Sequence, residues 1–295
     1  MASVGESLRS HRAEPVPAVW LVIGGIVSLQ FGAVIAKHLF ATVPPTALVW
    51  LRLATTAVVL LAVARPRLRH RCRGDWVVVL SFGVCLAVMN FAIYHAFARI
   101  PLGIAVMIEF LGPLAVAVLG SRRLRDLLWV LLAGVGVALL AFSRGELTLA
   151  GVLFALLAAA SWAAYILLSA QTGRRWTGVS GLGVASLVGT VGLAVPAIVE
   201  GDRLLSPRVL LLGVAIGLLS SVIPYSLELT ALRQIPPRVF GILMSLEPAA
   251  AALAAMLLLA EFLRWTQWLA LICVVLASVG ATRATRPEAE PTPEA

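Results

Sequence analysis

A few ionisable side chains interrupt otherwise apolar stretches of this sequence. Three of them are carboxylic acids, Glu109, Glu228 and Glu247. Two are cations, Lys37 and Arg52. Carboxyl groups in apolar surroundings can bind an ammonium group or exchange a proton, and a guanidinium can hold a carboxylate through two parallel hydrogen bonds. These residue types together suit a ligand that carries both charges, such as a free amino acid.

Two of the glutamates lie at or just before a proline. Pro113 follows Glu109 by one helical turn, and Pro248 directly follows Glu247. A proline inside a helix lacks an N–H and frees the carbonyl one turn earlier, so both glutamates are expected beside irregular backbone. We predict that one or both exchange a proton against a substrate ammonium group. The alternative is a protonated glutamic acid that hydrogen-bonds a neighbouring helix and stabilises packing.

The other three charges have simpler interpretations as well. Glu228 is expected near the end of its apolar stretch, where it either takes part in gating or is a solvated or Arg233-paired carboxylate. Arg52 is predicted to clamp a substrate carboxylate, with a structural salt bridge or snorkelling to the surface as the alternative. Lys37 is expected at the outer end of the first apolar stretch, where snorkelling is easiest.

Further polar or amphipathic side chains within the apolar stretches complete the set of candidate binding residues. His95 could titrate near physiological pH, although a single histidine between membrane helices more often makes a helix–helix hydrogen bond. Ser28 and Ser161 are expected to permit close helix packing. The remaining candidates are Gln30, Asn90, Tyr94, Trp162 and Tyr165.

The composition indicates which elements position these residues. The chain is 61% hydrophobic and 13% charged, whereas a soluble domain is about half apolar and about a quarter charged. The apolar residues come in blocks of about 20, the length of helix that crosses the hydrocarbon of a membrane. We therefore predict an all-α membrane protein of ten transmembrane helices, at 18–38, 45–64, 76–98, 102–119, 127–143, 150–171, 180–200, 208–232, 239–260 and 265–282.

The basic residues predict the orientation of the chain. The formal net charge of +9 resides mainly in short loops rather than in a stripe that could bind nucleic acid. With the N-terminus inside, cytoplasmic segments hold sixteen Lys and Arg residues and the opposite side holds five. We expect a multi-pass protein of the cell (inner) membrane with both termini, 1–17 and 283–295, in the cytoplasm. The second of these tails is rich in Pro and Glu and is expected to be disordered.

An internal repeat relates the two halves of the chain. Pro101 and Pro113 map onto Pro236 and Pro248 with one offset of 135 residues. Five helices in each half would place the second half upside down relative to the first. Inverted repeats recur in secondary carriers, with the binding site near the midplane, although gene duplication alone gives the same pattern. The predicted repeats span 18–143 and 150–282.

The segments around these prolines resemble the drug/metabolite transporter superfamily in its ten-helix EamA-type branch. They read PLGIAVMIEFLGPLAVAVLGSRR at 101–123 and IPYSLELTALRQIPPRVFGILMSLEPAAAALAAMLLLAE at 223–261. Together with 28–40, 50–61 and 160–173, they make the chain similar to the threonine/homoserine exporters. The resemblance implies two EamA repeats around a central cavity and proton-coupled efflux, by antiport, of small amino acids such as threonine or homoserine.

Other functions remain as alternatives. An exporter of another small metabolite or drug, such as a nucleoside or a toxic compound, would have the same architecture. A channel or an intramembrane enzyme is less compatible with the sequence, which contains no HExxH, GxSxG, metal-spaced His/Cys cluster or P-loop. We expect no catalytic residues, metal, cofactor or nucleic acid. The expected partners are the small-molecule substrate, protons and the lipid bilayer, and the sequence indicates nothing about the oligomeric state.

Overall fold

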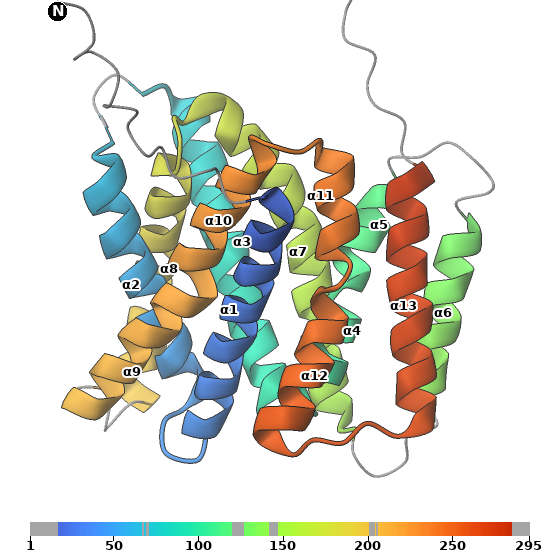
Figure 1. The fold of residues 1–295 in the computed structure, drawn as a ribbon. Coiled ribbons are helices and arrows are strands. Elements are labelled where there is room, and N and C mark those ends of the chain that lie inside the picture. Colours follow the sequence, from blue (N-terminus) through green and yellow to red (C-terminus); the bar gives the residue numbers. More distant parts are fainter. Residues whose placement is uncertain are drawn as a thin grey trace, which may run out of the picture.

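A computed structural model describes residues 17–66, 68, 71–119, 127–141, 147–200, 204 and 206–284. Within these residues all the regular elements are helices, which run side by side as a bundle (Figure 1). In chain order they are α1 (Ala18–Leu39), α2 (Pro45–Ala64), α3 (Arg73–Phe97), α4 (Leu102–Glu109), α5 (Leu111–Leu119), α6 (Leu127–Ala141), α7 (Leu149–Arg175), α8 (Ser180–Glu200), α9 (Pro207–Gly217), the π-helix η2 (Leu218–Val222), α10 (Ile223–Leu232), α11 (Pro237–Met244), α12 (Glu247–Leu259) and α13 (Trp265–Ala284).

Nine helical segments of the described chain are long and apolar enough to cross a membrane. In three of them shorter helices continue one another: α4 with α5, α9 with η2 and α10, and α11 with α12. The predicted span at 127–143 corresponds to α6, which is apolar but has 15 residues. The all-helical membrane architecture is thus confirmed. The count of ten spans and the inversion of the repeats stay predictions.

Two observed helix boundaries differ from the predicted ones by three or four residues. α3 begins at Arg73, three residues before the predicted start, and the Asp75 carboxylate accepts a hydrogen bond from the N–H of Cys72 at 3.3 Å. This carboxylate satisfies one of the free donors at a helix N-terminus and also pairs with Arg175. α7 continues to Arg175, four residues beyond the predicted end, so the ion pair joins the first turn of α3 to the last turn of α7.

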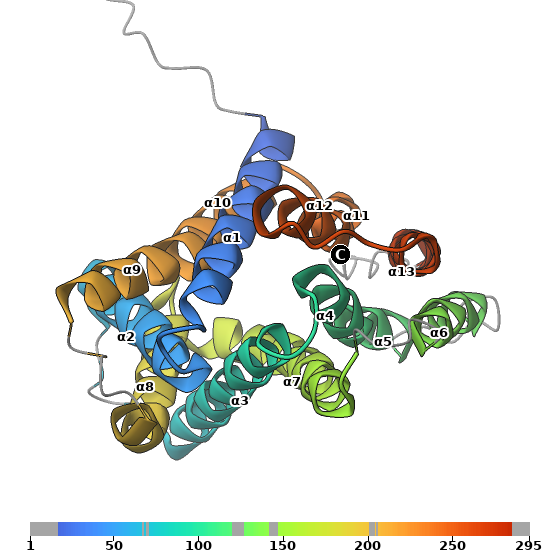
Figure 2. The same ribbon diagram turned by 90° about the horizontal axis from the view of Figure 1, so that it is seen from below.

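Seen along the helix axes, most of the helices surround a common centre. α6 and α13 lie side by side at one flank, remote from α2, α8 and α9 at the other (Figure 2). Large apolar side chains such as Val58, Leu211 and Leu257 are exposed on the outer surface. In a membrane these faces contact lipid, because lipid tails are as apolar as the side chains themselves.

Small residues bring helices of the two halves close together. A Cβ added at Gly103 in α4 would lie 2.9 Å from the Cα of Ala252 in α12, which is closer than side chains normally approach backbone. A Cβ at Gly32 in α1 would likewise collide with the hydroxyl of Ser220 in η2. Glycine at these positions lets the backbones pack directly against each other, as is common between membrane helices.

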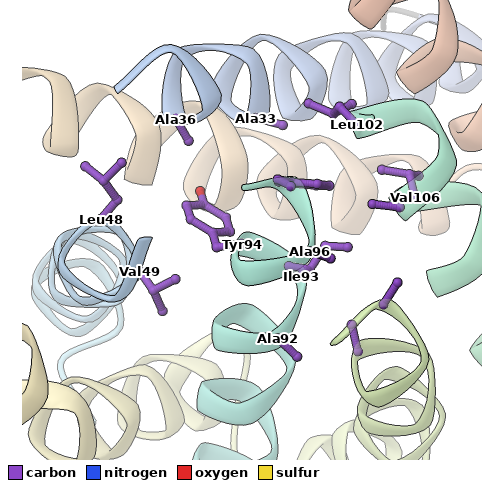
Figure 3. Packing of buried hydrophobic residues seen from close by; sticks show 14 of the residues in the cluster. Ala33, Ala36, Leu48, Val49, Ala92, Ile93, Tyr94, Ala96, Leu102 and Val106 are labelled. Carbon is purple, nitrogen blue, oxygen red and sulfur yellow. The ribbon is translucent and has the colours of Figure 1, made fainter. Parts of the chain in front are cut away.

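The buried core surrounds Tyr94 of α3. Its fully buried ring lies near Ala33 and Ala36 of α1 and Val49 of α2, so it fills the junction of three helices (Figure 3). The ring also lies edge-on to Phe40, with centroids 5.9 Å apart. This packing fixes the rotation of α3 about its axis and thereby decides which of its other side chains face the centre of the bundle.

Three irregularities interrupt the helices at the centre of the bundle. α4 ends at Glu109 and α5 begins at Leu111, while α11 ends at Met244 and α12 begins at Glu247. The expectation that both glutamates lie beside irregular backbone is confirmed. The third irregularity is η2, which ends two residues before Pro224. A π-helical turn inserted into an α-helix commonly marks a functional position.

Candidate functional site

A cavity of about 450 Å³ lies between the two halves of the chain. Helices from both halves contribute to its wall, among them α1–α4, α7 and α10–α13 (Figure 2). Its volume is in the range of small-molecule sites, which are about 300–1,000 Å³. The side chains with polar atoms that line it are Gln30, Arg52, Asn90, Glu109, Trp162, Tyr165, Ser220, Tyr225, Glu228, Glu247, Ser278 and Thr282.

The guanidinium of Arg52 is anchored on the π-helix. Its Nε donates to the Ser221 hydroxyl at 3.0 Å and its Nη2 donates to the Ser220 carbonyl at 2.9 Å. Pro224 has no N–H to give to the carbonyl four residues earlier, which is that of Ser220. Arg52 supplies a donor to this carbonyl instead. Within the described chain Nη1 makes no hydrogen bond, so this nitrogen is available to a ligand in the cavity.

A second helix also anchors the π-helical turn. The Ser28 hydroxyl of α1 donates to the carbonyl of Leu219 at 2.8 Å. Ser28 therefore does more than permit close packing, because it occupies a carbonyl of the irregular turn. With Arg52 bound from α2, η2 is fastened to two helices of the first half. The guanidinium is consequently held in one place rather than left to snorkel.

Three carboxyl groups face the same cavity as Arg52. Glu109 and Glu247 are 9% and 5% exposed, and Glu228 joins them from α10. None of the three forms an ion pair with a basic side chain of the described chain, and the alternative of an Arg233 partner for Glu228 is not found there. Unpaired carboxyl groups in a buried cavity favour bound protons or a bound cation. The cavity therefore has an excess of acidic groups that a proton or an ammonium group can neutralise.

Several polar atoms in the cavity wall have no hydrogen-bond partner among the residues that the structure describes. They are the Oε1 of Gln30, the Oδ1 of Asn90, the hydroxyl of Ser220 and the Oε2 of Glu247. The orientation of the Asn90 amide is fixed, because its Nδ2 donates to the Leu86 carbonyl at 2.8 Å. Buried polar groups are normally hydrogen-bonded, so a cluster of free ones around a cavity indicates a ligand or water site.

Aromatic residues form part of the wall between these polar groups. Trp162 packs edge-on against Phe110, the residue at the break between α4 and α5, with ring centroids 5.4 Å apart. Tyr165 of α7 and Tyr225 of α10 also line the cavity, as Glu228 does. Glu109 thus lies next to a packed aromatic contact, because Phe110 follows it in the chain.

Most of the predicted site residues are brought together by the fold, and three are not. Gln30, Arg52, Asn90, Glu109, Trp162, Tyr165, Glu228 and Glu247 line the cavity. Tyr94 is buried beneath Arg52, with the guanidinium 5.6 Å from its ring centroid. The ring of His95 hydrogen-bonds Thr46 at 3.1 Å and stacks on Phe154, as the helix–helix alternative predicts. Lys37 lies beyond the cavity wall.

Lys37 belongs to an ion-pair cluster at one end of the bundle. Its Nζ pairs with the Glu261 carboxylate at 2.5 Å and donates to the Ile100 carbonyl at 3.0 Å. The other oxygen of Glu261 accepts the N–H of Leu102 at 2.8 Å. The cluster ties together the end of α1, the turn between α3 and α4, and the segment after α12. It therefore closes this end of the bundle.

Four lining residues were missed by reasoning from the sequence. Tyr225 stands three residues before Glu228, a spacing that places both on one helix face, and this signal was available. Ser278 and Thr282 also share a face, at a spacing of four residues in α13. Ser220 could not have been found, because its exposure to the cavity depends on the π-helical turn.

Comparison with known proteins agrees with this architecture. Residues 149–283 match the EamA-like transporter family. The threonine/homoserine exporter RhtA of Salmonella typhimurium (strain LT2) is 40% identical over 279 residues, which cover 92% of this chain and 94% of that protein. The chain belongs to the EamA-like transporter family. RhtA of Escherichia coli K12 is 39% identical over 287 residues, covering 95% of this chain and 97% of that protein.

A solved structure shares the fold of this family member. A protein with a crystal structure, 19% identical in sequence, aligns with a TM-score of 0.64 over 90% of this chain and 96% of that chain. As a member of the EamA-like transporter family with relatives named exporters, the protein is a multi-pass membrane transporter and not an enzyme.

Proposed function

We propose that this transporter exports small zwitterionic amino acids, with threonine and homoserine as substrates, in exchange for protons. The observation that carries the proposal is the meeting of one anchored guanidinium and three unpaired carboxyl groups in a single buried cavity. Relatives that are about two-fifths identical over nearly their whole length are named threonine/homoserine exporters, which supports this choice of substrate.

The two charges of an amino acid would be bound by opposite sides of the cavity. Arg52 offers its free Nη1 to the carboxylate, while its other two nitrogens stay on η2. The ammonium group would bind where carboxyl groups are unpaired, at Glu247 with its free Oε2 and at Glu109. A substrate that lacks either charge leaves a buried group of the site without its partner, which costs binding energy.

Proton exchange follows from competition at the same carboxyl groups. A glutamate that binds the substrate ammonium group must be ionised, and a buried glutamate without a bound cation is favoured in its protonated form. A proton that enters from outside would displace the ammonium group, and the substrate would leave outward. On the cytoplasmic side the proton would leave and the next substrate would bind. The proton gradient thus drives export.

The proposed topology is two inverted five-helix repeats, 18–143 and 150–282, in the cell (inner) membrane. The first residue of α1 and the last of α13 lie at the same end of the bundle (Figure 1), which supports an even number of crossings. The excess of Lys and Arg in the loops at this end supports placing both termini in the cytoplasm. In this orientation the Lys37–Glu261 cluster closes the outer end.

Uptake of labelled threonine into everted membrane vesicles tests the proposal. We expect accumulation when the vesicle interior is acidified, and collapse of the signal when a protonophore is added. A panel of other amino acids and a nucleoside identifies the cargo, and the nucleoside should not be accumulated. Transport of the nucleoside alone, or threonine flux that ignores the proton gradient, would contradict the proposal.

The same vesicles test the two central glutamates. Glu109→Gln and Glu247→Gln remove a titratable group at nearly constant shape. We expect at least one variant to lose accumulation driven by a proton gradient while the protein remains in the membrane at normal abundance. Exchange of labelled for unlabelled threonine without a gradient reports whether the variant still binds substrate. Gradient-driven export retained in both variants would rule out these groups as the proton carriers.

A further inference from the structure

Asn90 lines the cavity and has a buried hydrogen-bond acceptor of fixed orientation. Its side chain is 2% exposed and projects from α3 between Met89 and Ile93, which also line the cavity. The Nδ2 donates to the Leu86 carbonyl one turn earlier, at 2.8 Å. Rotation of the amide by half a turn would place two oxygens against each other, so Oδ1 is the atom that remains free.

A free amide oxygen can accept a hydrogen bond but cannot donate one. The substrate carboxylate also only accepts, so it cannot satisfy Asn90. The ammonium group donates, yet its charge directs it to the unpaired carboxyl groups of Glu109, Glu228 and Glu247. The donor that remains on a hydroxylated amino acid is the side-chain hydroxyl. Asn90 is thus complementary to that group among the three that such a substrate offers.

We propose that Asn90 is the specificity-determining residue of the cavity, and that its Oδ1 accepts a hydrogen bond from the side-chain hydroxyl of the substrate. This inference rests on the proposed export of small amino acids. An apolar side chain of the same shape leaves Oδ1 buried and unpaired between Met89 and Ile93. A site that hydrogen-bonds a substrate hydroxyl discriminates far more strongly against the analogue without it than an apolar pocket does.

Pairs of amino acids of equal shape provide the test. Threonine and valine differ by a hydroxyl in place of a methyl group, and homoserine and norvaline differ in the same way. Competition against labelled threonine in proteoliposomes that hold the purified protein measures the ratio of apparent affinities within each pair. We expect the hydroxylated member to compete about tenfold better or more, the factor that one unpaired buried polar group typically produces.

Two substitutions of Asn90, by threonine and by valine, have side chains of equal shape. They separate the effect of a hydrogen-bond acceptor at this position from the effect of packing. In Asn90→Thr the hydroxyl can donate to the Leu86 carbonyl, as Thr56 and Thr190 do to carbonyls one turn earlier, and keep a lone pair toward the cavity. Asn90→Val has the same shape without an acceptor. We expect Asn90→Thr to retain a preference for threonine over valine and Asn90→Val to reduce the ratio to near one.

A buried hydroxyl outside the cavity gives the control. Thr172 is 3% exposed, and its Oγ1 also has no hydrogen-bond partner, but it does not line the cavity. Thr172→Val should leave the threonine to valine ratio unchanged. If Thr172→Val changes this ratio as Asn90→Val does, the effect is general to buried polar side chains and the inference is wrong.

The remaining outcomes separate this inference from the proposed function. If Asn90→Val transports threonine with an unchanged threonine to valine ratio, the proposed role of Asn90 is wrong. The proposed export of amino acids is unaffected by this result. A wild-type protein that transports threonine and valine equally well also overturns the role of Asn90, even if neither variant folds. A wild-type protein that transports no amino acid overturns both.

Discussion

Replacing Pro224 with alanine adds one backbone donor beside the guanidinium of Arg52. The new N–H can bond the Ser220 carbonyl four residues earlier, which in the wild type accepts from Nη2 of Arg52 at 2.9 Å. The guanidinium would then keep its bond to the Ser221 hydroxyl, at 3.0 Å, and lose the second anchor. We expect Arg52 to bind a substrate carboxylate more weakly as a result.

The size of the effect follows from the hydrogen bond that is lost. Hydrogen bonds to charged groups contribute about 1.5–3 kcal/mol, which corresponds to roughly a ten- to a hundredfold increase in the apparent KM for threonine. The free energy of unfolding should not fall, because an interior proline destabilises a helix and alanine removes that cost. Weaker transport combined with equal or greater thermal stability is the expected signature.

Transport by purified protein in proteoliposomes, together with thermal unfolding in detergent, checks this prediction. Pro196→Ala is the matched control, because Pro196 lies inside α8 and does not line the cavity. Ser221→Ala removes the other anchor and should raise the KM in the same direction. An unchanged KM in Pro224→Ala, or equal effects of Pro224→Ala and Pro196→Ala, would refute the reasoning.

Three further predictions concern stability and are checked by thermal unfolding of the purified variants. Glu261→Gln removes the ion pair with Lys37 and should destabilise the protein by about 1–2 kcal/mol, a modest amount because the pair is partly exposed. An unchanged midpoint of thermal unfolding would mean that the ion pair does not contribute to stability. Gly103→Ala should cost about 1–3 kcal/mol, because its Cβ would lie 2.9 Å from α12 backbone, whereas Gly134→Ala, with open space, should not destabilise. Tyr94→Phe removes a buried hydroxyl without a partner and should leave stability equal or higher by about 1 kcal/mol; a clear loss would reveal a bond to that hydroxyl.

The sequence alone determined the class of fold and the position of Glu109 and Glu247 beside irregular backbone. Long apolar blocks leave few alternatives to membrane helices, because backbone groups in hydrocarbon must be hydrogen-bonded within the segment. The prolines near Glu109 and Glu247 indicated irregular backbone through the loss of a donor, which is a local property. Both glutamates are found at helix breaks, and both line the cavity.

The tertiary structure decided which of the other polar residues face the cavity. Asn90, Tyr94 and His95 lie within two turns of one helix, yet they point to the cavity, into the core and toward Phe154 respectively. Their directions follow from the rotation of α3, which packing against neighbouring helices sets. Lys37 lies outside the cavity, where it pairs with Glu261. The two residues are 224 positions apart in the sequence, so this ion pair could not be predicted before the packing of distant helices was known.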